Sequence, residues 1–170
     1  MSIIIVGNGT SVIDKKNGYK IDGFNTVLRF NSFKIKDYED YTGAKTNIWF
    51  TVNAAHLKDI ENFDEIIVHS WEWDKSKCKI YQKLSKDKYC HKTSRPFVRS
   101  IPIQSPSTGL IAIYMMIERF NQVFITGFDW WEREKHHYGD TERRGTLHNP
   151  KEEYEIIKEL SNQNKILFLN

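Results

Sequence analysis

An apolar segment that opens with a helix start covers residues 104–128 and reads QSPSTGLIAIYMMIERFNQVFITGF. Pro106 is favoured just before a helix, and the hydroxyl of Ser107 can accept a hydrogen bond from the first turn. The residues that follow leave almost no polar face, so this helix is expected to be buried. Val123–Thr126 then has the pattern of a short interior strand. The segment predicts the core of an α/β domain.

The helix start at Ser107, Thr108 and Gly109 allows two interpretations. The first turn of a helix carries unpaired N–H groups and a partial positive charge, and a glycine lets a ligand approach the backbone, so an anion could bind there. An ordinary capped core helix has the same residues and is commoner. Both interpretations stay open on these residues alone.

Length and composition describe one globular domain covering residues 1–170. Hydrophobic residues make up 39% of the chain and charged residues 28%, and the net charge of +3 comes with no long basic run. These values argue against nucleic acid as a partner and slightly favour an anionic small molecule. Ile3–Val6 is too short for a signal peptide or a transmembrane segment, and the two cysteines lack metal-site or disulfide-framework spacing. A cytoplasmic location is expected.

Polar residues follow the first two predicted strands. Ser2–Val6 is a buried parallel strand by its pattern and ends in Gly7, Asn8 and Gly9, while Thr26–Phe30 is followed by Asn31. Open α/β sheets bind ligands at the carboxyl ends of their strands, so these side chains are candidates for ligand contacts. The glycine pair is not a GxGxxG motif and is weak evidence by itself.

Further strands are predicted at residues 47–52, 64–68 and 165–169, with a helical turn before Gly43. Strands that alternate with helices or loops over short connections are typical of parallel sheets. We therefore predict an α/β fold, a single Rossmann-like domain with a mainly parallel sheet flanked by helices on both faces.

The region from Trp71 to Arg95 is polar and basic and is the least informative part of the chain. It predicts one short amphipathic helix near Ile80 and Leu84, with loops on either side. Trp71 and Trp73 could line a sugar site, although two aromatic residues spaced by two are more often packed side chains of an extended segment.

A long segment after the central strand carries His136, His137 and Asp140, and such loops are often functional. Asn149, with Pro150 next and a glutamate three residues on, predicts a helix that runs to about residue 160. His148 then lies just outside its amino end, where the helix dipole disfavours the imidazolium and leaves the neutral ring that a general base requires.

Three other chemistries find little support. A metal site of His136, His137, Asp140 and His148 is disfavoured because the chain has neither HExxH nor a cysteine that completes a zinc set. The Asp-x-Asp sequence with which many nucleotide-sugar enzymes hold a divalent ion is absent as well. A serine hydrolase is disfavoured because GxSxG is missing.

Four segments, taken together, resemble the motifs of the eukaryotic-type sialyltransferases, glycosyltransferase family twenty-nine. In the order large, small, third and very-small motif, the matching residues are Ile5–Gly9 through Ile21–Phe24 to Val27–Asn31; Pro106–Gly109 with Thr126–Phe128; His137, Tyr138 and Asp140; and His148 with Glu153. They cover most of the chain outside residues 53–104. The resemblance implies a GT-A-like variant of the predicted fold.

The resemblance also implies roles. The residues that would hold the CMP-activated sugar are Gly7, Asn8, Gly9, Asn31, Ser107, Thr108, Gly109 and His137. His148 would be the base that deprotonates the acceptor hydroxyl in an inverting displacement, with Tyr138, Asp140 and Glu153 in support. A helix end and a histidine can offset the charge on one leaving phosphate, so neither metal nor cofactor is expected.

This sequence differs from the family's motifs in three ways. Phe120 stands where the small motif has a cysteine, so the linking disulfide is not expected and a bacterial or viral cytoplasm fits better than the Golgi. Gly139 replaces an aromatic residue of the third motif, and the segment that helps form the acceptor site is short.

The acceptor is expected to be a glycan or glycolipid, with peripheral membrane association left open. Two alternatives remain: a transferase that uses CMP-Kdo, and a catalytically inactive CMP-sugar-binding module of a glycan-synthesis complex.

Overall fold

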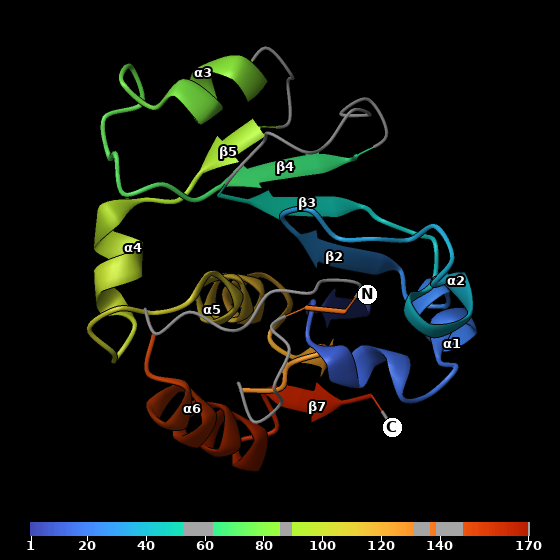
Figure 1. Cartoon of the computed structure of the whole chain (residues 1–170). Helices are drawn as coiled ribbons and strands as arrows, with labels where there is room; N and C mark the ends of the chain where they lie inside the picture. Colours follow the sequence, from blue (N-terminus) through green and yellow to red (C-terminus); the bar gives the residue numbers. More distant parts are fainter. Residues whose placement is uncertain (53–62, 86–89, 131–136, 139–147, 170) are drawn as a thin grey trace.

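The computed structural model describes residues 1–52, 63–85, 90–130, 137–138 and 148–169. Within these residues the chain forms one seven-stranded sheet in which every pair of neighbours is parallel (Figure 1). The strands are β1 (Ile3–Val6), β2 (Thr26–Phe30), β3 (Ile48–Thr51), β4 (Glu65–Val68), β5 (Cys90–Lys92), β6 (Val123–Thr126) and β7 (Ile166–Phe168). The predicted single α/β domain with a Rossmann-like sheet is confirmed.

β1 is an interior strand of the sheet, and its sequence shows why. All four of its residues are buried, as expected for a strand covered on both faces, whose side chains are apolar without alternation. Ile4 pairs with Val27 of β2 on one side and with Phe124 of β6 on the other. The amino-terminal strand thus lies beside β6, which is more than 100 residues away in the sequence.

The strand order, β5-β4-β3-β2-β1-β6-β7, reverses at β1. The chain builds outward from β1 to β5 and then returns to the other side of β1 to add β6 and β7. In open α/β sheets a crevice forms at the carboxyl ends of the strands where the order reverses. The loops after β1 and β6 therefore border the expected ligand site.

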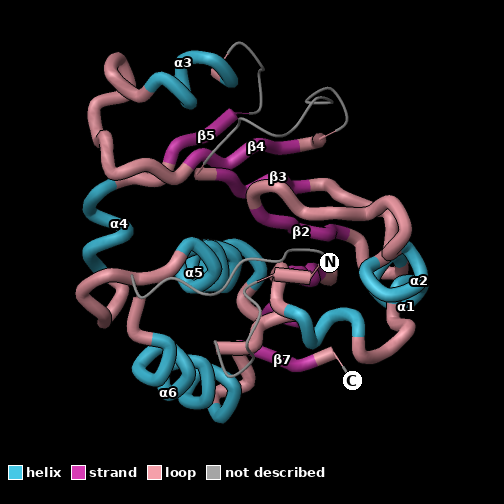
Figure 2. Tube along the Cα trace, in the orientation of Figure 1, coloured by secondary structure: helices cyan, strands magenta, loops and turns pink. Residues whose placement is uncertain are grey.

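Helices cover both faces of the sheet (Figure 2). They are η1 (Thr10–Ile13), α1 (Gly18–Asp22), α2 (Glu39–Thr42), α3 (Lys79–Leu84), α4 (Arg95–Ser100), α5 (Thr108–Phe120) and α6 (Pro150–Asn162). Residues of α4, α5 and α6 pack into one core with alternate residues of the strands. Residues of η1 and α1, and separately of α3, pack on the opposite face.

Helix α5 begins as its sequence predicts. The Ser107 side chain accepts a hydrogen bond from the N–H of Leu110 at 3.2 Å, and the helix ends before Asn121, whose φ of 63° is left-handed. Its buried residues are Leu110, Ile111, Ala112, Ile113 and Met116. None of the helices in the described part of the chain is both long enough and apolar enough to cross a bilayer.

The region after β4 holds more structure than the sequence predicts. The expected helix is α3, but β5 and α4 follow it. β5 has only three residues, lies at the edge of the sheet and exposes His91, so it lacks the apolar run that marks a buried strand. Its position comes from pairing with β4, which the local sequence does not encode.

Candidate active site

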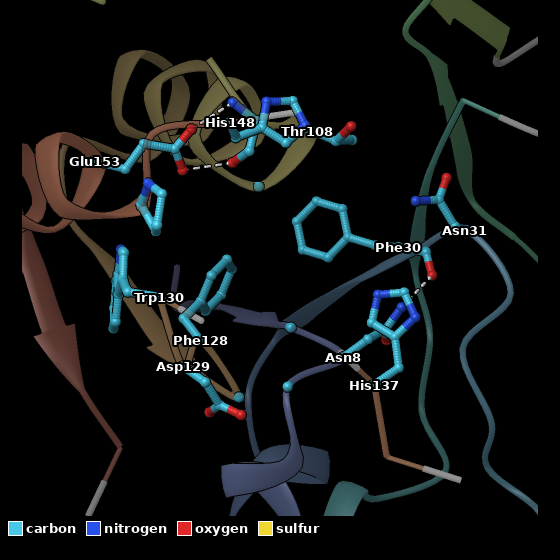
Figure 3. Close-up of a pocket in the computed structure, with 16 residues that line it drawn as sticks. Asn8, Phe30, Asn31, Thr108, Phe128, Asp129, Trp130, His137, His148 and Glu153 are labelled. Carbon is cyan, nitrogen blue, oxygen red and sulfur yellow. Dashed lines mark hydrogen bonds between the residues drawn. The ribbon is translucent and has the colours of Figure 1, made fainter. Parts of the chain in front are cut away.

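A cavity of about 300 Å³ lies at the carboxyl ends of β1, β2 and β6, between the amino ends of α5 and α6 (Figure 3). Its lining residues are Gly7, Asn8, Gly9, Phe30, Asn31, Ser107, Thr108, Gly109, Gly127, Phe128, Asp129, Trp130, His137, His148, Pro150 and Glu153. All eight residues expected to bind the donor are among them, together with His148 and Glu153.

The floor of this pocket is a close contact between two loops. The N–H of Gly7 donates to the Thr126 carbonyl at 2.8 Å, and the N–H of Gly9 donates to the Gly127 carbonyl at 2.8 Å. A Cβ on Gly7 would lie 2.2 Å from the Gly127 oxygen, which no side chain can accommodate. Gly127 itself has a φ of 71°. These glycines let the loops after β1 and β6 meet.

Asn8 is held at the edge of the pocket with one side-chain atom unsatisfied. Its amide nitrogen donates to the Phe30 carbonyl at 3.2 Å, which fixes the orientation of the amide. Its Oδ1 is buried and has no hydrogen-bond partner within the described residues. A buried acceptor of this kind is costly without a donor, so a bound hydroxyl or amine would satisfy it.

Asn31 follows β2 with a left-handed φ of 46°, which asparagine tolerates better than most residues. Its Oδ1 accepts from the N–H of Val52 at 2.9 Å, and its carbonyl accepts from the indole N–H of Trp49 at 2.9 Å. With its oxygen committed to β3, the side chain turns its amide nitrogen toward the pocket (Figure 3).

Glu153 ties the amino ends of α5 and α6 together. Its carboxylate accepts from the Ser107 N–H at 2.6 Å and from the Ser107 hydroxyl at 2.7 Å. The side chain is buried, and this burial raises the carboxyl pKa even though both Ser107 hydrogen bonds and nearby His148 lower it. Glu153 therefore clamps the start of α5 to the first turn of α6.

The second residue of α5, Gly109, lies against an aromatic ring and also lines the cavity. A Cβ on Gly109 would lie 2.8 Å from the Phe128 ring, so the missing side chain makes room for this ring. Thr108 precedes it in the first turn and lines the pocket. The helix end still presents its first N–H groups and partial positive charge to the cavity.

His148 lies just before α6, at the mouth of the pocket. Its Nδ1 is 3.2 Å from the Ser105 carbonyl oxygen, which can only accept a hydrogen bond. This contact favours the tautomer with the proton on Nδ1, and in the neutral ring the lone pair then lies on Nε2. A neutral ring in this tautomer can take a proton from a hydroxyl group.

His137 lies beside Asn8, and its neighbour Tyr138 fixes its position (Figure 3). The Tyr138 N–H donates to the Asn8 carbonyl at 3.0 Å, and its buried hydroxyl donates to the Lys34 carbonyl at 2.6 Å. Burial raises the pKa of this phenol, so it stays a neutral donor. Two other residues of this segment that the sequence singled out, His136 and Asp140, lie outside the described residues.

Sequence reasoning missed part of the lining: Phe30, Gly127, Phe128, Asp129, Trp130 and Pro150. Asp129 accepts hydrogen bonds from the Ser11 N–H and the Thr10 hydroxyl, which fasten the first loop to the end of β6. A signal was present, because residues 128–130 follow a predicted interior strand as Asn8 and Asn31 do. The aromatic residues were not recognised because aromatic side chains also fill cores.

The site combines a helix amino end, two imidazoles and two amides around one cavity. Such donors suit an anion, because N–H groups and imidazoles can stabilise negative charge that develops on a leaving phosphate. Among the described residues no three metal-binding side chains come together. The cavity is therefore suited to a ligand that carries a phosphate group.

This chain matches a known protein family. The family model described as glycosyltransferase family 29 (sialyltransferase) matches residues 2–70 and 67–165. A rat CMP-N-acetylneuraminate-beta-1,4-galactoside alpha-2,3-sialyltransferase is 30% identical over 73 residues, which are 41% of this chain and 20% of that protein. The chain thus spans about a fifth of that relative's length.

Two solved structures share the fold. A mammalian sialyltransferase in complex with Gal-beta-1-3GalNAc-ortho-nitrophenol superposes with a TM-score of 0.70 at 20% identity, covering 99% of this chain and 68% of that one. A variant of the sialyltransferase CST-II in complex with CMP gives 0.63 at 16% identity, covering 98% and 79%. With the family model matching nearly the whole chain, this protein belongs to glycosyltransferase family 29, the sialyltransferases.

Proposed function

We propose that this chain is an inverting, metal-independent glycosyltransferase that moves a sialic-acid-type sugar from its CMP donor to a hydroxyl of a glycan or glycolipid. The observation that carries the proposal is the convergence of three groups on one cavity: the amino end of α5, His137 and His148. They come from separate parts of the chain and meet where the strand order reverses.

Donor binding uses the groups already held in place. The first turn of α5 and His137 bind the phosphate, and the amides of Asn8 and Asn31 bind the nucleotide. The buried, unsatisfied Oδ1 of Asn8 supports this, because a ligand hydroxyl or amine gives it a partner. CMP bound to one of the solved structures of the same fold supports the choice of nucleotide.

In the transfer step the acceptor oxygen attacks the anomeric carbon while its proton moves to Nε2 of His148. The bond between the anomeric carbon and the phosphate oxygen breaks, and its electron pair leaves with CMP. Negative charge then grows on the phosphate beside the α5 helix end and His137, which stabilise it. Because attack and departure take place on opposite faces of the sugar, the configuration inverts.

Glu153 and Tyr138 are positioning residues in this scheme. Glu153 holds Ser107 at the start of α5, and Tyr138 holds the backbone next to His137. The third-motif aspartate, Asp140, is proposed to support the same segment. Phe120, where the small motif has a cysteine, supports a reducing compartment such as the cytoplasm as the place of reaction.

Two alternatives give different results in one experiment. The wild-type protein is incubated with CMP-Neu5Ac and with CMP-Kdo, first alone and then with a panel of glycans, and released CMP is measured. The proposal expects release from CMP-Neu5Ac that rises with acceptor. Release from CMP-Kdo but not from CMP-Neu5Ac would identify the protein as a CMP-Kdo-dependent transferase. Tight CMP binding without release from either donor would assign the inactive binding module.

A further inference from the structure

A second group of ligand-type side chains lies at the carboxyl ends of β4 and β5. It consists of His69, Trp71, Trp73, Lys92 and Thr93, and we call it the β4–β5 cluster. Because all strands are parallel, the carboxyl ends of β4 and β5 lie on the same side of the sheet as those of β1, β2 and β6, which border the donor cavity (Figure 1). None of its members lines that cavity.

The aromatic members stand against one another in edge-to-face pairs. Ring centroids are 5.9 Å apart for Trp71 and Trp73 and 5.3 Å apart for His69 and Trp71. Trp71 keeps 60% of its surface exposed, which is unusual for the largest side chain. An exposed indole held by its neighbours offers an apolar face on which a sugar ring can stack.

His69 provides the base of the cluster. Its Nδ1 is 2.9 Å from the Thr93 hydroxyl, and both side chains are buried. Burial, together with the charge of Lys92, lowers the pKa of His69 to about 4, so the ring is neutral at physiological pH. The cluster therefore contains one positive charge among these five residues, that of Lys92.

The ammonium group of Lys92 has no hydrogen-bond partner in the part of the chain that the structure describes, and it is buried. It lies 5.1 Å from the centre of the Trp73 ring, a cation–π contact that offsets only part of its lost hydration. An anionic ligand would satisfy it. The flexible lysine stem lets the ammonium turn toward such a ligand without backbone movement.

Hydrogen bonds between neighbouring strand ends connect the cluster to the donor cavity. The Val52 N–H donates to Asn31 Oδ1 in the cavity wall, the His69 N–H donates to the Thr51 carbonyl, and the Thr93 N–H donates to the Val68 carbonyl. β4 is two strands away from β2, a distance of roughly 10 Å across the sheet. One or two sugar rings span this distance.

We propose that the β4–β5 cluster binds the acceptor and selects acceptors that carry an anionic group, a carboxylate or a phosphate. Trp71 stacks on the acceptor ring, and the Lys92 ammonium pairs with the anionic group. This inference rests on the proposed function, since it assigns the acceptor class of that reaction.

The test compares three acceptors of one scaffold: methyl β-galactoside, its 6-phosphate and the corresponding galacturonide. CMP release is measured for the wild type, Lys92→Met and the control Lys77→Met, which removes an exposed lysine of the neighbouring connection. The wild type should use one or both anionic acceptors with a kcat/KM at least about 10-fold higher than that of the neutral acceptor. Lys92→Met should abolish this preference through KM, while Lys77→Met should retain it.

The preferred anionic acceptor identifies the source of the charge. Equal use of all three acceptors by the wild type would overturn the proposal, and so would equal effects of Lys92→Met and Lys77→Met. CMP release without acceptor should be the same in all three proteins, which separates acceptor selection from donor chemistry.

A binding measurement decides the proposal even if no donor is turned over, an outcome that would contradict the proposed function alone. Tryptophan fluorescence of the wild type is titrated with the 6-phosphate and the galacturonide. Binding that weakens about 10-fold or more in Lys92→Met, and in Trp71→Ala to a smaller degree, supports the proposal. Absence of any fluorescence change with either anionic galactoside overturns it.

Discussion

Two regions at the carboxyl ends of the strands are built in different ways: a first half around β1, β2 and β6, and a second half at β4 and β5. Around β1, β2 and β6 the polar side chains are fixed by backbone partners: Asn8 by the Phe30 carbonyl, Asn31 by Val52 and Glu153 by Ser107. At β4 and β5 the β4–β5 cluster is held chiefly by contacts between its own side chains.

The first region is therefore expected to be more rigid than the second. Groups that must meet a developing charge gain from fixed positions, because no reorganisation is then needed during the reaction. A side-chain cluster can adjust to different ligands at smaller cost. We therefore propose that the first half carries out the reaction and that the second half selects the acceptor.

The largest expected effect concerns His148, in the half assigned to the reaction. His148→Ala should reduce turnover by about 100-fold to 10,000-fold, the usual contribution of a general base, while leaving CMP binding unchanged. Steady-state rates and calorimetry with CMP measure the two quantities. The exposed His91 at the far edge of the sheet provides the control, and His91→Ala should match the wild type in both.

Two results would count against this assignment. Near-normal turnover of His148→Ala would show that another group is the base. Loss of CMP binding would show that His148 is a donor ligand or a support for α6.

His137→Ala should act on both quantities at once. This ring is proposed to contact the phosphate before the reaction and more strongly as charge grows, so its loss should weaken CMP binding and slow turnover, each by about 10-fold. The same assays apply. A variant that binds CMP normally and only turns over slowly would remove His137 from the donor site.

Glu153→Ala should lower the free energy of unfolding by about 1 to 3 kcal/mol, because it leaves the Ser107 N–H and hydroxyl without their acceptor. Glu153→Gln keeps one acceptor and should cost less. Burial raises the folded-state pKa of this carboxyl above its unfolded value, so folding favours the protonated form. Wild-type stability should therefore decline, relative to Glu153→Gln, as the pH rises through the folded pKa.

Urea unfolding of these proteins between pH 4 and pH 7 measures both effects. Equal stability of the alanine and glutamine variants would show that Glu153 does not clamp the two helix starts together.

His69 should give the opposite pH dependence in the second half. Its pKa is about 4 in the folded protein and 6.5 in its ordinary state, so between these values the unfolded chain binds a proton that the folded one does not. Wild-type stability should fall as the pH drops from 6.5 toward 4, and His69→Gln should reduce that fall. Identical pH profiles of the two proteins would contradict a buried neutral His69.

The smallest expected effect is that of chelation. EDTA should leave turnover nearly unchanged, because the sequence has no Asp-x-Asp and the proposed charge stabilisation uses N–H groups and imidazoles. Loss of turnover that added divalent ion restores would favour the metal interpretation of residues 136–148. Reducing agent should also have no effect, since Phe120 replaces the motif cysteine.

Local sequence is sufficient to specify the central strands and the two long helices. The apolar runs of β1 and β6, the Ser107 cap and the Asn149-Pro150 start all have local physical causes, and each was found within one or two residues of its predicted position. The carboxyl-end rule for parallel sheets also pointed to Asn8 and Asn31, and both line the cavity. What these features share is that neighbouring residues alone specify them.

Contacts between residues far apart in the sequence are set by the tertiary structure. The contact between Glu153 and Ser107 joins residues 46 positions apart, and β5 exists only because β4 offers an edge for pairing. The space above Gly109 is filled by Phe128, which no local pattern could reveal. That the buried ammonium of Lys92 has no hydrogen-bond partner among the described residues likewise follows from the packing around it. Such features depend on through-space distances, which a linear pattern of residue types does not contain.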